Sequence, residues 1–117
     1  MDILPTKKLE QLGVILKAVL EIIGHLKESG ISAKELTYKE VIKYFVEERP
    51  SDPRVDKGAF VVERHAKGIM TIWTFLDSNN QPVTSDKGKP YYRKLKVTHF
   101  DKELEEMLDG QSLLIVT

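Results

Sequence analysis

Pro50-Ser51-Asp52-Pro53 marks the point at which the hydrophobic period of the chain changes. Before this segment, apolar residues recur every three or four positions, as they do on one face of a helix. After it, they alternate with polar residues or run together, as they do in strands. Helices followed by strands in a chain of 117 residues predict a single α+β domain, in which helices pack on a small mixed sheet as two layers.

The first predicted helix covers residues 6–29. Its apolar residues form a stripe wider than the two positions per heptad of a coiled coil, and Gly30 ends the pattern. A stripe of this width favours burial against the sheet. Any part that the sheet leaves uncovered predicts self-association or contact with a protein partner through this helix.

Two capping boxes in tandem follow the first helix. In Ser32–Glu35 and again in Thr37–Glu40, a hydroxyl residue is followed three positions later by glutamate. Because each such pair is typical of a helix start, the pattern predicts a helical turn near 33–36 and a second helix at 38–48.

Four strands and one short helix are predicted after the proline segment. The strands cover about 59–65, 69–76, 91–98 and 112–117, and the helix covers 102–109. The strand at 69–76 is apolar on both faces, which indicates a central place in the sheet. A tight turn joins it to the strand before it, so these two form a hairpin. The last strand follows a helix, which predicts a parallel crossover from the strand at 91–98.

The composition excludes several classes of function. The chain has 18 basic and 18 acidic residues, so its net charge gives no long-range attraction for nucleic acid or anionic lipid. It has no cysteine, which excludes disulfides, thiol catalysis and thiolate metal sites. Charges interrupt the long apolar stretches and no secretory signal is visible, so we expect a cytoplasmic protein that does not enter membranes.

A basic strand is the first candidate site. Tyr92, Arg93, Lys94 and Lys96 combine aromatic and cationic side chains on one predicted strand. Aromatic residues stack on nucleic-acid bases and lysines bind phosphates, so these residues are candidates for nucleic-acid binding. The balanced charge of the whole chain and the acidic helix at 102–109 argue against it.

A winged-helix arrangement is a second route to nucleic-acid binding. Helix, helical turn, helix and hairpin occur in the order of that fold, with the helix at 38–48 as the recognition helix. That helix carries Lys39 and Lys43, but acidic residues outnumber them. A recognition helix of this kind would repel phosphates.

The histidines are the third candidate site. Glu63 and His65 share one face of a predicted strand, and His99 lies near the end of another. If the two strands were neighbours, the imidazoles of His65 and His99 would form an acid–base pair suited to a small hydrolase or nuclease. No metal-ligand spacing and no glycine-rich phosphate loop occurs, so we expect neither a metal nor a cofactor.

No motif in the sequence is strong enough to decide the function. The best prediction is a small non-enzymatic binding or regulatory module that acts through protein–protein contacts. A nucleic-acid-binding domain and a small hydrolase or nuclease are the alternatives.

Overall fold

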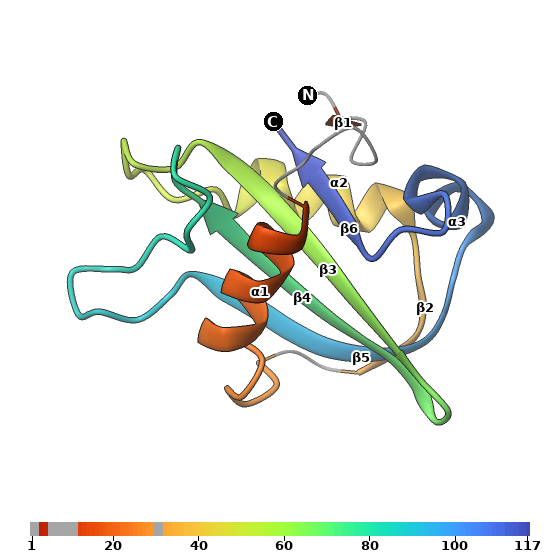
Figure 1. The fold of residues 1–117 in the computed structure, drawn as a ribbon. Helices are drawn as coiled ribbons and strands as arrows, with labels where there is room; N and C mark the ends of the chain where they lie inside the picture. Colours follow the sequence, from red (N-terminus) through yellow and green to blue (C-terminus); the bar gives the residue numbers. More distant parts are fainter. Residues whose placement is uncertain (1–2, 5–11, 30–31) are drawn as a thin grey trace.

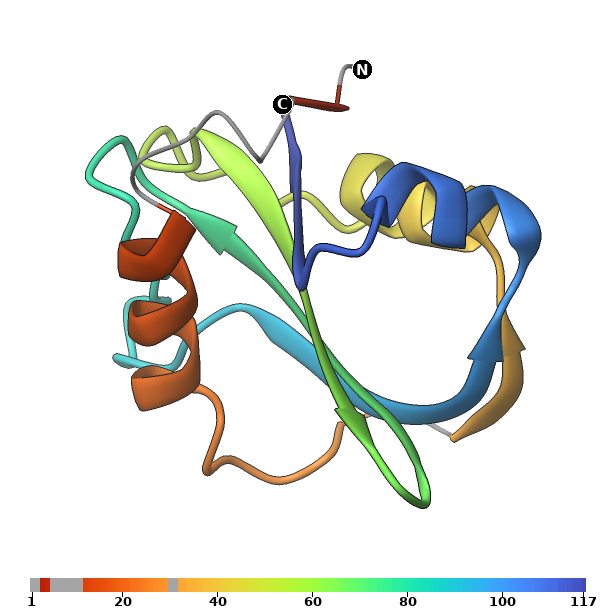
Figure 2. The same ribbon diagram turned by 45° about the vertical axis from the view of Figure 1, so that its right-hand side comes forward.

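Three helices and a six-stranded sheet form the part of the chain that the computed structural model describes, residues 3–4, 12–29 and 32–117. The helices are α1 (Leu12–Ile22), α2 (Tyr38–Glu47) and α3 (Lys102–Leu108). α1 lies on one face of the sheet, and α2 and α3 lie on the other (Figures 1 and 2). The α+β class is confirmed. The predicted two-layer arrangement is wrong, because the first two helices cover opposite faces and produce three layers.

The sheet is mixed, as predicted. Its strand order is β1 (Ile3–Leu4), β6 (Leu113–Val116), β3 (Lys57–His65), β4 (Gly68–Leu76), β5 (Tyr92–Phe100) and β2 (Ala33–Leu36). The β3–β4 hairpin is confirmed, and β4 is central. Only β2 and β5 are paired in parallel; the other neighbours are antiparallel.

The predicted parallel crossover into the last strand is wrong. β6 pairs antiparallel with β3 and does not neighbour β5. Every residue of β6 is buried, with Leu113 and Ile115 in the core under α1 and Leu114 and Val116 in the core under α2 and α3. A strand that is apolar on both faces removes most apolar surface from water when helices cover both of its faces, so this position stabilises the fold most.

α1 is shorter than the predicted helix. Residues 6–11 of that prediction lie outside the described ranges, and α1 ends at Ile22, earlier than predicted. Beyond this point, the Lys94 ammonium donates hydrogen bonds to the carbonyl oxygens of Gly24 (2.6 Å) and Leu26 (3.0 Å). These carbonyls therefore have a tertiary partner and need no further helical turn.

The predicted helical turn near 33–36 is also wrong. These residues form strand β2, which pairs with β5 so that Ala33 lies opposite Val97 and Leu36 lies opposite Phe100. Leu36 is fully buried in this arrangement. An isolated helical turn closes very few hydrogen bonds for the residues it fixes. Pairing with β5 gives the segment interstrand hydrogen bonds and buries Leu36, so it overrides the local capping pattern.

One carboxylate connects the starts of α2 and α3. Thr37 caps α2 as predicted, since its Oγ1 accepts a hydrogen bond from the Glu40 backbone N–H (3.1 Å). Asp101 Oδ1 caps α3 by accepting from the Leu104 N–H (2.9 Å), and it also accepts from the Tyr38 N–H of α2 (3.1 Å). The relative position of the two helices is thereby fixed at their N-termini.

The two faces of the sheet have different cores. The α1 face is aliphatic and contains Ile15, Val19, Ile23, Ala59, Val61, Ile72, Leu76, Leu113 and Ile115. The other face is rich in rings, among them Tyr44, Phe45, Phe60, Trp73, Phe75 and Phe100. The alternation predicted for β4 is confirmed, since Ile72 and Trp73 point to opposite cores. The indole N–H of Trp73 donates to Thr71 Oγ1 (2.8 Å), which fixes the ring.

Candidate binding groove between α2 and β5

Two adjoining cavities lie where α2 passes the beginning of β5. One, of about 330 Å³, is lined mainly by charged residues of α2: Glu40, Lys43, Tyr44, Glu47, Glu48 and, from β5, Arg93. The other, of about 310 Å³, is lined by Ser29, Tyr44, Glu48, Phe75, Tyr91, Tyr92 and Arg93. Because both cavities share Tyr44, Glu48 and Arg93, we describe them together as the α2–β5 groove.

Arg93 lies in the middle of this groove. Its guanidinium carbon is 4.5 Å from the centre of the Tyr44 ring and 5.3 Å from the centre of the Trp73 ring. These are cation–π distances. Within the described ranges, the Arg93 side chain forms no salt bridge and no hydrogen bond with a protein oxygen. Within the described ranges, the Tyr44 and Trp73 rings therefore hold the Arg93 guanidinium through cation–π contacts only.

Tyr44 is the residue through which α2 contacts Arg93. It is 9% exposed, and its ring stacks near Phe75 and meets Trp73 edge to face. Burial raises the pKa of Tyr44 to about 12; the nearby Arg93 acts in the opposite direction and Glu48 acts in the same direction. The phenol is therefore neutral at any physiological pH.

Residues before β2 close the groove on the side of the sheet edge. The Lys94 backbone N–H donates to Ser29 Oγ (2.9 Å), and the Ser29 N–H donates to the Lys94 carbonyl (2.8 Å). The Tyr92 hydroxyl donates to the Lys27 carbonyl (3.1 Å). These bonds hold Ser29 against a part of β5 that β2 does not reach.

A third cavity shares the lining residue Tyr91 with the groove. It has a volume of about 630 Å³ and is lined by Ser51, Asp52, Pro53, Arg54, Ser85, Asp86 and Tyr91. Arg54 donates to both carboxylate oxygens of Asp52 and to the Thr84 carbonyl, which ties the proline segment to the loop before β5. The Arg54 hydrogen bonds lower the pKa of the Asp52 carboxyl to about 2.

The predicted nucleic-acid-binding residues lie on different faces. Arg93 points toward α2, whereas Tyr92 and Lys94 point toward α1. Lys94 is buried, and its ammonium is bound by backbone carbonyls. Lys96 extends along Gly68 at the hairpin, with its Cε close to that glycine. The four side chains therefore do not form one basic surface.

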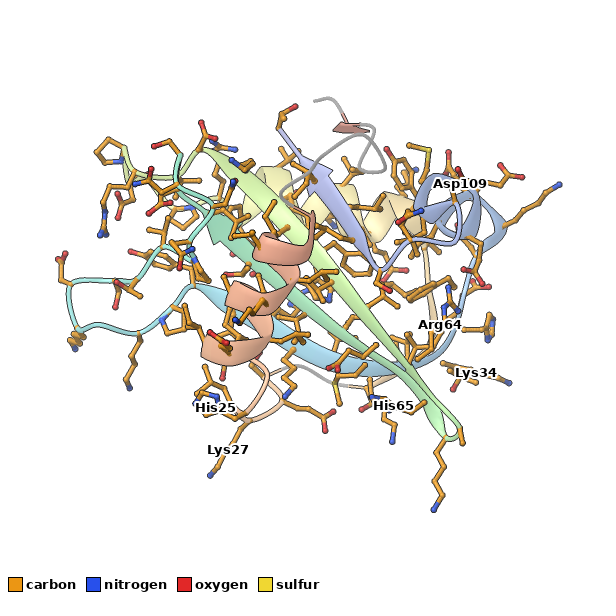
Figure 3. All side chains as sticks on the ribbon, viewed as in Figure 1. His25, Lys27, Lys34, Arg64, His65 and Asp109 are labelled. Carbon is orange, nitrogen blue, oxygen red and sulfur yellow. The ribbon has the colours of Figure 1, made fainter. Side chains whose placement is uncertain are left out.

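The predicted histidine pair is also separated. His65 lies at the closed end of the β3–β4 hairpin, opposite Gly68, and points to solvent (Figure 3). His99 lies on β5, and its Nε2 is 3.2 Å from Glu35 Oε2 of β2. Glu63 lies opposite Met70. No hydrogen bond or ion pair within the described ranges joins the two imidazoles, and none of the three cavities above is lined by them.

Two further findings concern the described residues. They contain no group of three or more histidine, aspartate or glutamate side chains placed to hold a metal ion. None of the helices they form has the length and apolar character needed to cross a membrane.

The chain was compared with protein-family models, with curated proteins and with solved structures. None of the three comparisons found a match.

Sequence reasoning selected Arg93 but missed its environment. Nothing in the sequence pattern connected Arg93 with Tyr44, which lies on a different predicted element. The signal that was present is the alternation of β5. Leu95 and Val97 point to the core, so Arg93 shares their face, and a cation at a core-facing position indicates a special environment.

Proposed function

We propose that the protein is a small non-enzymatic binding module that takes a segment of a partner protein into the α2–β5 groove. The lining of the groove supports this most directly, because two tyrosines, Tyr44 and Tyr91, lie with Arg93 in that lining. Tyrosine and arginine are enriched among the residues that dominate binding energy at protein interfaces. They combine a large contact area with polar ends that form hydrogen bonds.

The form of the groove suits a polypeptide segment better than a small molecule. Small-molecule sites are mostly apolar and bury most of the ligand surface. Here the lining is largely charged and hydroxylated, and it extends through two adjoining cavities to a third one at Tyr91. An extended segment contacts such a series of cavities along its length.

The nucleic-acid alternative has less support. A polyanion in the groove would meet three carboxylates, those of Glu40, Glu47 and Glu48, and only two cations. The carbonyls around Lys94 use a cation that would otherwise bind phosphate. The hydrolase alternative also has less support, because His99 pairs with Glu35 and not with His65.

Peptide selection tests the proposed function. Random peptides displayed on phage are selected on the wild-type protein, and the affinity of the best peptide is measured by fluorescence anisotropy. Tyr91→Ala should weaken binding about tenfold or more, because interface tyrosines are frequent hot spots. Tyr38→Ala is the matched control, since Tyr38 is also half-buried on the same core but does not line the groove.

Three results would contradict the proposal. Selection could give no peptide that binds above background, or the two tyrosine variants could weaken binding equally although both are folded. Salt-dependent retention on polynucleotide, with no peptide binding, would favour the nucleic-acid alternative instead.

A further inference from the structure

We infer that Arg93 is the specificity-determining residue of the groove and that it binds a carboxylate of the ligand. The inference rests on the proposed function only for the statement that this carboxylate belongs to a polypeptide. The carboxylate site itself depends on the surroundings of Arg93 and is tested separately.

Arg93 differs from the other three arginines of the chain in its interaction partners. Arg49 donates to the carbonyls of Val55 and Asp56, and Arg54 and Arg64 donate to carboxylates: Arg54 to Asp52 and Arg64 to Glu105. Arg93 alone among them, within the described ranges, has only aromatic partners. A guanidinium has five N–H donors, so Arg93 keeps its full capacity to bind an oxygen ligand.

Two aromatic rings orient the Arg93 guanidinium. Tyr44 and Trp73 contact the Arg93 guanidinium through their rings, and a ring attracts a cation without occupying its N–H groups. Both rings are largely or fully buried, and Trp73 is also fixed by its hydrogen bond to Thr71. The guanidinium is thereby positioned before a ligand arrives, which lowers the entropy lost on binding.

The charges around Arg93 distinguish a carboxylate ligand from a phosphate ligand. Both match the fork of a guanidinium, and a carboxylate binds it through two parallel hydrogen bonds. Glu40, Glu47 and Glu48 line the same cavity, yet none forms a salt bridge with Arg93. Their combined charge repels a doubly charged phosphate more strongly than a singly charged carboxylate. Of these two anions, the groove therefore favours the carboxylate.

The first experiment uses small probes on the whole protein. Sodium acetate, acetamide and inorganic phosphate are titrated at constant ionic strength, and NMR follows the Arg93 Nε–Hε signal. We expect a saturable shift with acetate, none with the isosteric neutral acetamide, and a weaker response to phosphate. Arg64 is an internal control, because it also lies over a ring, 5.4 Å from the centre of Phe100, but already binds Glu105.

The results of this titration are decisive in either direction. An equal response of Arg93 and Arg64, or an equal response to acetate and acetamide, would overturn the inference. A stronger response to phosphate than to acetate would overturn it in favour of a phosphate ligand. A shift of Arg93 but not Arg64 that is saturable with acetate, weaker with phosphate and absent with acetamide would support it.

The second experiment uses a peptide from the selection described above. Each acidic residue of that peptide is replaced by its amide, and both forms are tested on wild type, Arg93→Gln, Arg93→Lys and Arg64→Gln. Arg93→Gln should weaken the acidic peptide about tenfold or more and leave the amide peptide nearly unchanged, because only the acidic form loses charge-assisted hydrogen bonds. Arg93→Lys should restore binding only in part, since lysine lacks the planar fork.

The two proposals fail in different ways. If peptides bind in the groove but show no coupling to Arg93, the inference is overturned and the binding function stands. If acetate shifts Arg93 but no peptide is ever selected, the carboxylate site stands and the polypeptide partner is overturned.

Discussion

Arg93 and Lys94 are adjacent on β5, and their surroundings are opposite. The Lys94 ammonium is buried and bound by the carbonyl oxygens of Gly24 and Leu26. The Arg93 guanidinium is half-buried and lies over the rings of Tyr44 and Trp73, with no oxygen partner in the described residues. The first cation completes the fold, and the second remains available to a ligand.

The difference comes from the two faces of the sheet. On the aliphatic face, the segment after α1 brings two carbonyl groups over β5, and these accept hydrogen bonds from the Lys94 ammonium. On the aromatic face, Tyr44 of α2 and Trp73 of β4 contact the Arg93 guanidinium, and rings attract a cation without satisfying its donors. Neighbouring residues of like charge can therefore have unrelated roles when a strand is covered on both sides.

Trp73→Ala should have the largest effect on stability among the substitutions that test this comparison. This change removes a fully buried ring from beneath Arg93, so we expect a loss of about 3–5 kcal/mol in unfolding free energy and a changed Arg93 Nε–Hε signal. Leu76→Ala on the other face should cost about 2–5 kcal/mol and leave that signal unchanged. Denaturant unfolding and NMR provide the two readouts. An unaltered Arg93 signal in Trp73→Ala would show that the indole does not hold the guanidinium.

Gly58→Ala tests how closely α2 approaches the sheet. A Cβ at Gly58 would lie 2.3 Å from Cδ1 of Phe45, a fully buried side chain. We expect a loss of about 1–3 kcal/mol, the usual cost of overpacking. Gly13→Ala in helix α1 is the control, because a Cβ at this position would have no neighbouring atom within 4 Å. It should stabilise the protein by up to about 1 kcal/mol, since alanine favours a helix more than glycine does. Equal effects of the two changes in thermal unfolding would contradict this packing.

Replacing the two neighbouring cations by methionine compares them directly. Lys94→Met leaves two carbonyls without their partner, so we expect a loss of about 1–3 kcal/mol. Arg93→Met removes only cation–π contacts and should cost at most about 1 kcal/mol. Denaturant unfolding measures both changes. The reverse order of the two losses would contradict the roles assigned to these residues.

The smallest expected effect is on the pH dependence of the unfolding free energy, through Tyr44 on the aromatic face. Burial raises the pKa of Tyr44 to about 12, above its ordinary value of 10.0. The folded state therefore holds this proton more tightly than the unfolded state does. The contribution to stability is complete below pH 10 and is lost as the pH rises from about 10 through about 12. Tyr44→Phe should show a flatter stability profile in this window, and an identical profile in the two proteins would disprove the assignment.

Local patterns predicted the elements well but not their neighbours. Apolar alternation and short apolar runs identified β3, β4, β5 and β6, because side-chain burial follows the period of the strand and its place in the sheet. The segment at 33–36 was assigned wrongly, because a capping pattern is local whereas pairing with β5 depends on residues far along the chain. The direction and place of β6 were also beyond prediction, because a strand that is apolar on both sides fits several positions in a sheet.

The groove was less predictable than the fold. It is formed by α2, β5 and the residues before β2, which are distant in the sequence, so no spacing pattern marks it. Arg93 was grouped with Tyr92, Lys94 and Lys96 because they are close in the sequence, although alternation places it on the other face. The ring contacts that hold Arg93 depend on how α2 crosses the sheet, and a single sequence does not give that geometry.

The place of β6 has a consequence for biosynthesis. β6 lies between β1 and β3, yet among the described elements it is the last one to be translated. Until residues 113–116 emerge, one backbone edge of β3 has no hydrogen-bonding neighbour, and β1 has no strand to join. Unpaired strand edges recruit other chains. A nascent chain interrupted before this strand therefore exposes the unpaired edge of β3 to pairing with other chains.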